Sequence, residues 1–396
     1  MALGAQEMIR FSLALVAATI VGATPGLADF SSCKDGLRAE AERSGVSRST
    51  VAAAFDNLTP DTKILELENA QPEFKTPIWD YLAALVDDER VRDGKAAMAA
   101  NAKALSLAER RFGVSKYVIA AIWGVESNFG SEMGGRPLVQ SLTTLACSGS
   151  RRPQYFRSEL MAALKIADRG DIPLEKLRGS WAGAFGQTQF MPSTFLRLAV
   201  DLDGTGRDIV DNPAAALGST ANYLRKSGWR AGEPWGFEVK LPADYSGPQG
   251  RRNKHPMTFW AARGIRRING EGLGSGAAGL LLPAGEKGPA FLVTRNFDAI
   301  YSYNAAESYT LAAAILAQRL AGGPGIVAPW PTDDPGLSRA ERRELQALLA
   351  KHGYDVGTPD GAIGAKTKSA IADFQQRTGL AVNGRASEKV LERLRQ

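Results

Sequence analysis

The first 320 residues repeat their apolar positions mostly at the spacing that amphipathic helices require. Apolar side chains recur every three or four positions, opposite charged ones, in "RSGVSRSTVAAAFDNL" and "YLAALVDDERVRDGKAAMAANAKALSLAERRFG". The same spacing returns in "AAESYTLAAAILAQRL", residues 305–320. The pattern predicts a mainly α protein.

Two segments interrupt this spacing. Residues 234–300 are rich in Gly and Pro and contain "FEVKL" and "AFLVT", short apolar runs that are typical of strands. In residues 322–336, eight of fifteen positions are Gly or Pro, a composition that continues neither helix nor sheet. We therefore expect an α+β fold with a small β-containing insertion, followed by an interdomain linker.

The last sixty residues, 337–396, predict a separate small domain of three helices. The helices are expected in "LSRAERRELQALLAKHGY", "AIGAKTKSAIADFQQRTGL" and "ASEKVLERL". Their apolar stripes are supplied by Leu345, Leu348, Leu349, Ile371 and Phe374.

The N-terminus has the composition of a secretory signal, residues 1–28. Arg10 precedes the apolar run 11–22, which is too short to span a bilayer, and Gly26 and Ala28 suit a cut after Ala28. The alternative is a buried first helix. We expect an exported, periplasmic protein without a transmembrane anchor, whose catalytic domain would occupy residues 29–321.

The chain contains two cysteines, Cys33 and Cys147. In an exported protein two thiols favour a disulfide, which here would close a long loop. The alternative is a lipid anchor on Cys33, but "FSSC" matches the lipidation sequence poorly.

Composition and charge narrow the chemistry. The net charge of +6 over 396 residues favours a polyanionic partner such as nucleic acid, a membrane surface or an acidic wall polymer. No dense Lys/Arg run occurs, so we expect no nucleic-acid partner. With only two histidines, and neither a G-x-S-x-G elbow nor a Walker loop, carboxylate chemistry remains.

Glu126 is the carboxylate whose position is unusual. In "GVSKYVIAAIWGVESNFG", a helix expected to be capped by Ser115 and stopped by Gly130, Glu126 follows Ile119 and Ile122 on the apolar stripe. Burial raises the pKa of a carboxyl group, as a general acid at neutral pH requires. The alternative is a structural Glu at the edge of the stripe, extended toward solvent or paired with an arginine.

A second stretch, "RGSWAGAFGQTQFMPSTF", combines small residues with hydroxyl, amide and aromatic side chains. Ser180, Trp181, Gln187 and Gln189 would suit the lining of a sugar-binding groove. The alternative is a Gly-rich turn packed at the start of a helix.

These stretches resemble the lytic murein transglycosylases of the membrane-bound B type. "GVESNFG", "RGSWAGAFGQTQFMPSTF", "STANYLRKSGW" and "VTRNFDAIYSYNAAESYTLA" match the family's motifs in order, over residues 30–320. The C-terminal unit resembles a three-helix peptidoglycan-binding domain. The resemblance implies a lysozyme-like fold and non-hydrolytic cleavage of the β-1,4 bond between N-acetylmuramic acid and N-acetylglucosamine, which forms 1,6-anhydro ends.

The same resemblance assigns roles to individual residues. Glu126 matches the sole catalytic acid and base. The residues implied to bind the glycan or its peptide stem are Ser180, Gln189, Tyr303, Asn304, Tyr309, Tyr81, Arg151, Arg152 and Tyr155. The alternatives are core packing for the tyrosines and a solvated surface pair for the two arginines.

"DLDGTGRDIVDN" resembles the calcium loop of some relatives. Asp201, Asp203 and Thr205 stand at positions 1, 3 and 5, but position 12 is Asn212, where a bidentate carboxylate is wanted. A plain Asx-rich turn is the alternative, so the metal stays open; no cofactor is expected.

Three functions stay in competition. A lytic transglycosylase would act with Glu126 alone on the glycan strands of peptidoglycan, as a monomer. A hydrolytic muramidase would need a second carboxylate, for which Glu132, Asp168 and Asp201 are nearest in sequence. A wall-binding scaffold would use Glu126 only structurally.

Overall fold

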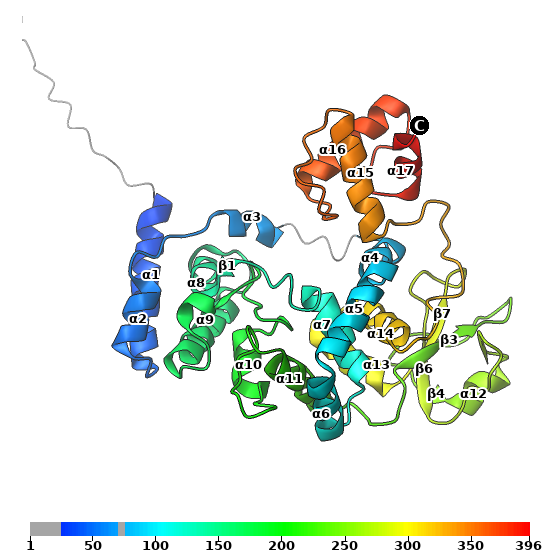
Figure 1. The fold of residues 1–396 in the computed structure, drawn as a ribbon, viewed down its shortest axis with the longest axis horizontal. Helices are drawn as coiled ribbons and strands as arrows, with labels where there is room; N and C mark the ends of the chain where they lie inside the picture. The colour runs from blue at the N-terminus through cyan, green and yellow to red at the C-terminus, as the bar shows by residue number, and fades with distance from the viewer. Residues whose placement is uncertain (1–24, 70–75) are drawn as a thin grey trace, which may run out of the picture.

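The computed structural model describes residues 25–69 and 76–396, and helices dominate it (Figure 1). The predicted signal lies outside the described residues except for its last four, which open α1 (Pro25–Arg43). Within those two ranges, none of the helices combines the length and apolar character that a bilayer-spanning helix needs.

One helical cluster, here called the N-terminal core, is formed by α1, α2, α8, α9 and α10. Their bounds are Pro25–Arg43, Arg48–Phe55, Leu138–Ser148, Pro153–Asp168 and Pro192–Leu198. Leu142 and Leu160 are fully buried where α8 packs on α9. Two short helices, α3 (Lys63–Asn69) and η2 (Leu174–Lys176), and a two-stranded ladder of β1 (Arg136–Pro137) and β2 (Arg178–Gly179) border this cluster.

A second cluster, the central core, surrounds α14 (Glu307–Leu320). The other helices are α4, α5, α6, α7, α11 and α13, with bounds Ile78–Leu85, Asp88–Ala100, Ala102–Phe112, Lys116–Ser127, Pro213–Lys226 and Arg295–Asn304. Ala312, Ala313 and Ala314 are fully buried in α14, and their small side chains let α7 approach closely. Tyr223 and Tyr303 pack against both cores, so they mark the boundary between them.

The interruption predicted at residues 234–300 contains an antiparallel sheet. Its strand order is β4-β6-β7-β3-β5, with bounds His255–Pro256, Ala277–Leu281, Ala290–Val293, Gly236–Lys240 and Arg266–Arg267. The two predicted strands, β3 and β7, are neighbours, and Phe237 pairs with Leu292. α12 (Met257–Ala262) covers the sheet with Trp260, whose indole donates to the Ala278 carbonyl at 2.8 Å. The small β-containing insertion is therefore confirmed.

The C-terminal domain has the three predicted helices, α15 (Arg339–Lys351), α16 (Ala365–Thr378) and α17 (Glu388–Leu394). Leu345, Leu349 and Ile371 are fully buried in its core. The segment 322–336 before it has no helix and no strand, as its composition predicts. In Figure 1 the domain stands beside α4, at the upper right.

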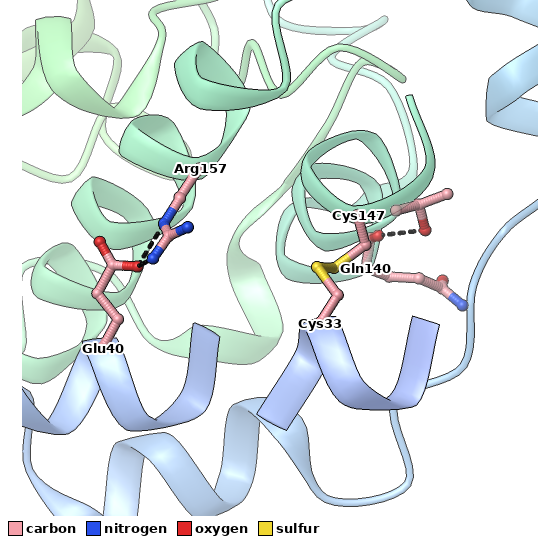
Figure 2. The surroundings of a disulfide bond; sticks show 6 residues. Cys33, Glu40, Gln140, Cys147 and Arg157 are labelled. Carbon is pink, nitrogen blue, oxygen red and sulfur yellow. Dashed lines mark hydrogen bonds and ion pairs between the residues drawn. A yellow bond between two sulfur atoms is a disulfide. The ribbon is translucent and has the colours of Figure 1, made fainter. Parts of the chain in front are cut away.

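The predicted disulfide between Cys33 and Cys147 is present and joins α1 to α8 (Figure 2). Further along α1, Glu40 accepts a hydrogen bond from Arg157 of α9. The lipid-anchor alternative for Cys33 is excluded in this structure because its sulfur is bonded to that of Cys147.

Some predicted helix boundaries are wrong. The Glu126 helix ends at Ser127, because Asn128 adopts a left-handed conformation (φ 49°) two residues before Gly130, and Ser115 occupies the N-cap position without a side-chain bond. The long segment 81–113 is divided into α4, α5 and α6. Asp87 begins α5 by accepting from the Arg90 amide at 2.7 Å, a local cap that the apolar spacing does not reveal.

Candidate active site

The buried stripe of α7 presents Glu126 at the boundary of the two cores. Ile119 and Ile122 are fully buried, whereas Glu126, on the last turn, stays half-buried. The hydroxyl of Tyr309 donates to Oε1 of Glu126 at 2.6 Å. The carboxyl group is thus enclosed by protein but still accessible from outside.

Burial raises the pKa of Glu126 from its ordinary 4.5 to about 7, and the hydrogen bond from Tyr309 opposes this rise. A carboxyl group with this pKa is protonated in about half of the molecules at neutral pH. Glu126 can therefore both donate and accept a proton under the same conditions, as a general acid and base must.

α13 and α14 bring a pair of tyrosines to Glu126. The rings of Tyr303 and Tyr309 are stacked, with centroids 6.4 Å apart and planes 9° apart. Tyr303 donates to the Thr188 carbonyl at 2.7 Å. Burial raises the pKa of both phenols well above the ordinary value, so both hydroxyl groups remain donors.

Tyr81 and Asn304 are placed less centrally. Tyr81 of α4 packs against the central core, and its phenol lies close enough for its ionised form to raise the pKa of Tyr309. Asn304 is the last residue of α13 and is exposed.

The Ser180 segment is a tight turn. The Ser180 amide donates to the Ala184 carbonyl at 2.8 Å, and the Ala184 amide donates to Oγ of Ser180 at 3.0 Å. A Cβ on Gly179 would lie 2.0 Å from the Ala184 oxygen, so only glycine permits this turn. Among the described residues Oγ of Ser180 acts only as an acceptor, so its proton is available to another partner.

Gln189 connects the same segment to the loop that follows Glu126. Its Nε2 donates to the carbonyls of Met133 (3.0 Å) and Gly186 (2.8 Å), from a left-handed backbone (φ 49°). Next to Glu126, Ser127 donates to the Gln187 carbonyl. The end of α7 and the Ser180–Gln189 segment therefore form one hydrogen-bonded unit.

The predicted residues Arg151, Arg152 and Tyr155 line a separate cavity of about 570 Å³. The guanidinium of Arg152 lies 4.8 Å from the centroid of the Tyr155 ring. Trp181, which directly follows Ser180, lines the same cavity, so the cavity adjoins the Ser180 turn. Cations and aromatic rings together suit an anionic, partly apolar ligand.

Glu68 also lines this cavity, although it was not among the residues predicted from the sequence. Glu68, on α3 and only 3% exposed, accepts from the Ser150 amide (3.0 Å), the Ser150 hydroxyl (3.1 Å) and the Arg151 amide (2.8 Å). It therefore fixes the turn that carries both arginines. No motif surrounds Glu68, and only the apolar spacing of its short helix could have suggested that it is buried.

The three carboxylates considered as partners of Glu126 are engaged elsewhere. Asp168 accepts from Ser47 and Thr50 of the N-terminal core, Asp201 accepts from the Gly204 amide at 2.7 Å, and Glu132 accepts from Asn128 at 3.2 Å. No second carboxylate contributes to the raised pKa of Glu126 in the described part of the chain. The geometry thus favours a mechanism with one carboxylate.

The candidate calcium loop is closed by its own hydrogen bonds. Asp203 accepts from Thr205 Oγ1 at 2.6 Å, and Asn212 Nδ2 donates to the same hydroxyl at 2.7 Å. Oδ1 of Asn212 caps α11 through two amides. Within residues 25–69 and 76–396, no group of three or more His, Cys, Asp or Glu side chains could hold a metal. In this structure these side chains form an Asx turn.

A mainly helical fold that encloses a carboxyl group of raised pKa is what a lysozyme-like glycan-cleaving enzyme requires. A family model described as "Transglycosylase SLT domain" matches residues 29–318, and one described as "Putative peptidoglycan binding domain" matches residues 338–394. The chain belongs to the SLT transglycosylase family and carries a C-terminal peptidoglycan-binding domain.

Known proteins agree with this assignment. The chain is 32% identical over 277 residues to membrane-bound lytic murein transglycosylase B of Escherichia coli (strain K12), covering 69% of this chain and 74% of that protein. The crystal structure of SltB3 from Pseudomonas aeruginosa with NAG-anhNAM-pentapeptide is similar over 93% of this chain and 100% of that chain, with 45% identity and a TM-score of 0.74.

The lytic transglycosylase Slt35 of Escherichia coli in complex with calcium is also similar. Its TM-score is 0.64 at 28% identity, over 73% of this chain and 92% of that chain. Calcium is thus present in a relative, although the hydrogen bonds of the Asp201–Asn212 loop in this chain form a closed turn.

Proposed function

We propose that Glu126 is the single acid and base with which this peptidoglycan lytic transglycosylase cleaves the glycan strand and forms 1,6-anhydromuramoyl ends. The observation that carries the proposal is the isolation of Glu126: burial raises its pKa to about 7, and its hydrogen-bond partner is a tyrosine. A relative of this chain is bound to a NAG-anhNAM-pentapeptide, which carries the expected anhydro end.

The reaction needs two proton transfers, one from Glu126 and one back to it. Protonated Glu126 gives its proton to the glycosidic oxygen while the bond from that oxygen to C1 of N-acetylmuramic acid breaks. The resulting carboxylate then removes the proton of the C6 hydroxyl as O6 bonds to C1. The sugar supplies its own nucleophile in place, so no second carboxylate is required, and Glu126 ends the cycle protonated.

The surrounding residues support this chemistry. Tyr309 orients the carboxyl group through its hydrogen bond to Oε1. Ser180 and Gln189, with Tyr303, Asn304 and Tyr81, would bind the sugars on either side of the cleaved bond. Arg151, Arg152 and Tyr155 would bind the peptide stem in the cavity they line, where two cations suit its carboxylates.

The decisive experiment compares the products that wild type and Glu126→Gln release from purified sacculi, by mass spectrometry. We expect anhydro-muropeptides from wild type and a rate about 10²–10⁴-fold lower for the variant, the usual size of general acid catalysis. Glu66→Gln, at an exposed glutamate of α3, is the matched control and should keep the wild-type products.

Two other outcomes would contradict the proposal. Reducing-end products from the wild type would make the protein a hydrolytic muramidase. Binding to sacculi without the release of soluble fragments would make it a wall-binding scaffold.

We further propose that the enzyme acts as a monomer in the periplasm, after removal of residues 1–28. The relatives are bacterial enzymes of murein and peptidoglycan, which agrees with a place in the cell envelope. Mass determination of the protein recovered from the envelope should give a chain that begins at Asp29. A chain that retains residues 1–28 would contradict this location.

A further inference from the structure

The turn after Glu126 has an unusual backbone. Asn128 (φ 49°) and Phe129 (φ 59°) both adopt the left-handed conformation, which residues other than glycine seldom adopt, here at two consecutive positions. Such a conformation persists only where surrounding contacts hold it, and it begins two residues after the proposed catalytic acid. The contacts that hold this turn therefore influence where Glu126 lies.

Phe129 is held by a slot between two helices. A Cβ on Gly94 of α5 or on Gly124 of α7 would lie 2.7 Å or 2.5 Å from Cζ of its ring. The ring also packs edge-on against Trp123, with centroids 5.6 Å apart. The catalytic domain itself therefore holds the Phe129 side of the turn in place.

Asn128 is held by the C-terminal domain. Arg339, the first residue of α15, donates through NH1 to Oδ1 of Asn128 at 3.0 Å. The other end of the Asn128 amide donates to Glu132 at 3.2 Å. A residue of the peptidoglycan-binding domain therefore reaches the turn that follows Glu126.

Arg339 is itself fixed in place. Its NH2 donates to Asp93 at 2.9 Å, and its backbone amide donates to Oδ2 of Asp87 at 3.0 Å. Oδ1 of Asp87 accepts from the Arg90 amide, so one carboxylate caps both α5 and α15. The Arg339 side chain is only 13% exposed, which limits screening of these bonds by water.

A second contact, made by Arg385, also docks the C-terminal domain on the catalytic domain. Arg385 makes a two-pronged ion pair with Asp80 of α4, at 2.5 Å and 2.7 Å, and the Asp80 side chain is 7% exposed. A Cβ on Gly336 would lie 2.5 Å from Cα of Asp80, so the linker backbone contacts α4 directly. Figure 1 shows α15 against α4.

We propose that Arg339 is a positioning residue for Glu126, so that the peptidoglycan-binding domain completes the active site in addition to binding the wall. This inference rests on the role proposed above for Glu126. Without Arg339, the Asn128 turn loses its bond to α15 and relaxes toward ordinary backbone angles. The last turn of α7 then moves, and Glu126 no longer meets the glycosidic oxygen in a productive geometry.

The test measures kcat and KM of Arg339→Ala on a soluble NAG–NAM oligosaccharide, a substrate too short to need separate wall binding. We expect kcat to fall about tenfold to hundredfold while KM stays within about twofold, as for lost positioning. Arg339→Lys keeps the charge but not the fork-shaped donor, so its kcat should lie between those of wild type and Arg339→Ala. Arg343→Ala, one turn later on α15, removes an interdomain ion pair with Glu89 and should keep wild-type kcat.

Two further readouts separate positioning from general destabilisation. In Arg339→Ala, water should reach Glu126, lower its pKa from about 7, and move the alkaline limit of kcat to lower pH. Asn128→Gly adopts the left-handed turn unaided, so adding Arg339→Ala to it should cost little more. Melting curves verify that each variant is folded.

An unchanged kcat in Arg339→Ala, or an equal loss in Arg343→Ala, would overturn this inference while leaving the role of Glu126 intact. Full activity of Glu126→Gln would instead overturn the proposed function. The two failures are therefore distinguishable in one set of variants.

Discussion

Two glutamates lie at the ends of helices and are shielded from water, Glu68 in α3 and Glu126 in α7, but their surroundings differ. Glu68 of α3 accepts three hydrogen bonds, from Ser150 and Arg151. Within the part of the chain that the structure describes, Glu126 of α7 accepts one, from Tyr309, and its pKa rises to about 7. Hydrogen bonds from donors favour the charged form of a carboxyl group, and burial favours its protonated form.

Other buried carboxylates resemble Glu68. Glu159, 2% exposed, accepts from the amide and the hydroxyl of Ser193 at the start of α10. Asp87 accepts amides from α5 and α15. Each of them fixes a helix start by satisfying N–H groups that lack a partner within the helix. Glu126 fixes no helix, which leaves it available for substrate.

Glu68→Ala should have the largest effect on stability. It leaves two amides and a hydroxyl without their acceptor near the cavity, so the free energy of unfolding should fall by about 2–3 kcal/mol, measured by urea titration. KM should rise because the turn of Arg151 loosens, while kcat, set by Glu126, should hold. Glu66→Ala on the exposed side of the same helix is the control, with a change within about 0.5 kcal/mol. A kcat loss as large as that of Glu126→Gln would break the contrast between the two glutamates.

The apolar spacing of the sequence predicted that Glu126 lies on a buried helix face. It placed Glu126 on the buried stripe of α7, and it predicted the mainly α fold and the three C-terminal helices, because periodicity records which face of an element is covered. The disulfide followed from the cysteine count and the expected export, and the structure confirms it.

The hydrogen-bond partners around the site depend on contacts between distant segments, which the apolar spacing does not record. Tyr309 lies 183 residues from Glu126, and Arg339 lies 211 residues from Asn128. Helix breaks such as the one at Asp87 depend on a cap, and a cap is a local hydrogen bond that the hydrophobic pattern does not contain. The resemblance supplied Tyr309, but nothing in the pattern indicated Arg339 or Glu68.

The pH dependence of stability gives a smaller, second test of the contrast. Glu126 has a pKa of about 7 in the folded chain and about 4.5 when unfolded, so between these pH values the folded chain retains a proton that the unfolded chain has released. The Glu126 contribution to stability therefore falls as pH rises through this window. It falls by on the order of 2–3 kcal/mol, with some allowance for partial exposure.

Glu126→Gln removes this dependence. The stability of the variant relative to wild type should increase between pH 4.5 and pH 7.5, measured by urea unfolding at both values. Glu66→Gln, which changes an exposed glutamate, should show no such trend. A relative stability that is flat with pH for Glu126→Gln would mean that its carboxyl group is well solvated.

Tyr309→Phe should have the smallest effect and isolates the hydrogen bond from Tyr309 to Glu126. That bond favours the charged form of Glu126, so its loss raises the pKa further. Because the reaction begins with protonated Glu126, the alkaline limit of kcat should move to higher pH. The loss in kcat at its optimum should stay below about tenfold, since a neutral hydrogen bond contributes about 1 kcal/mol. Movement of that limit to lower pH would show that the phenylalanine side chain admits water to the carboxyl group. Tyr309 would then act by excluding water, and its hydrogen bond would be secondary.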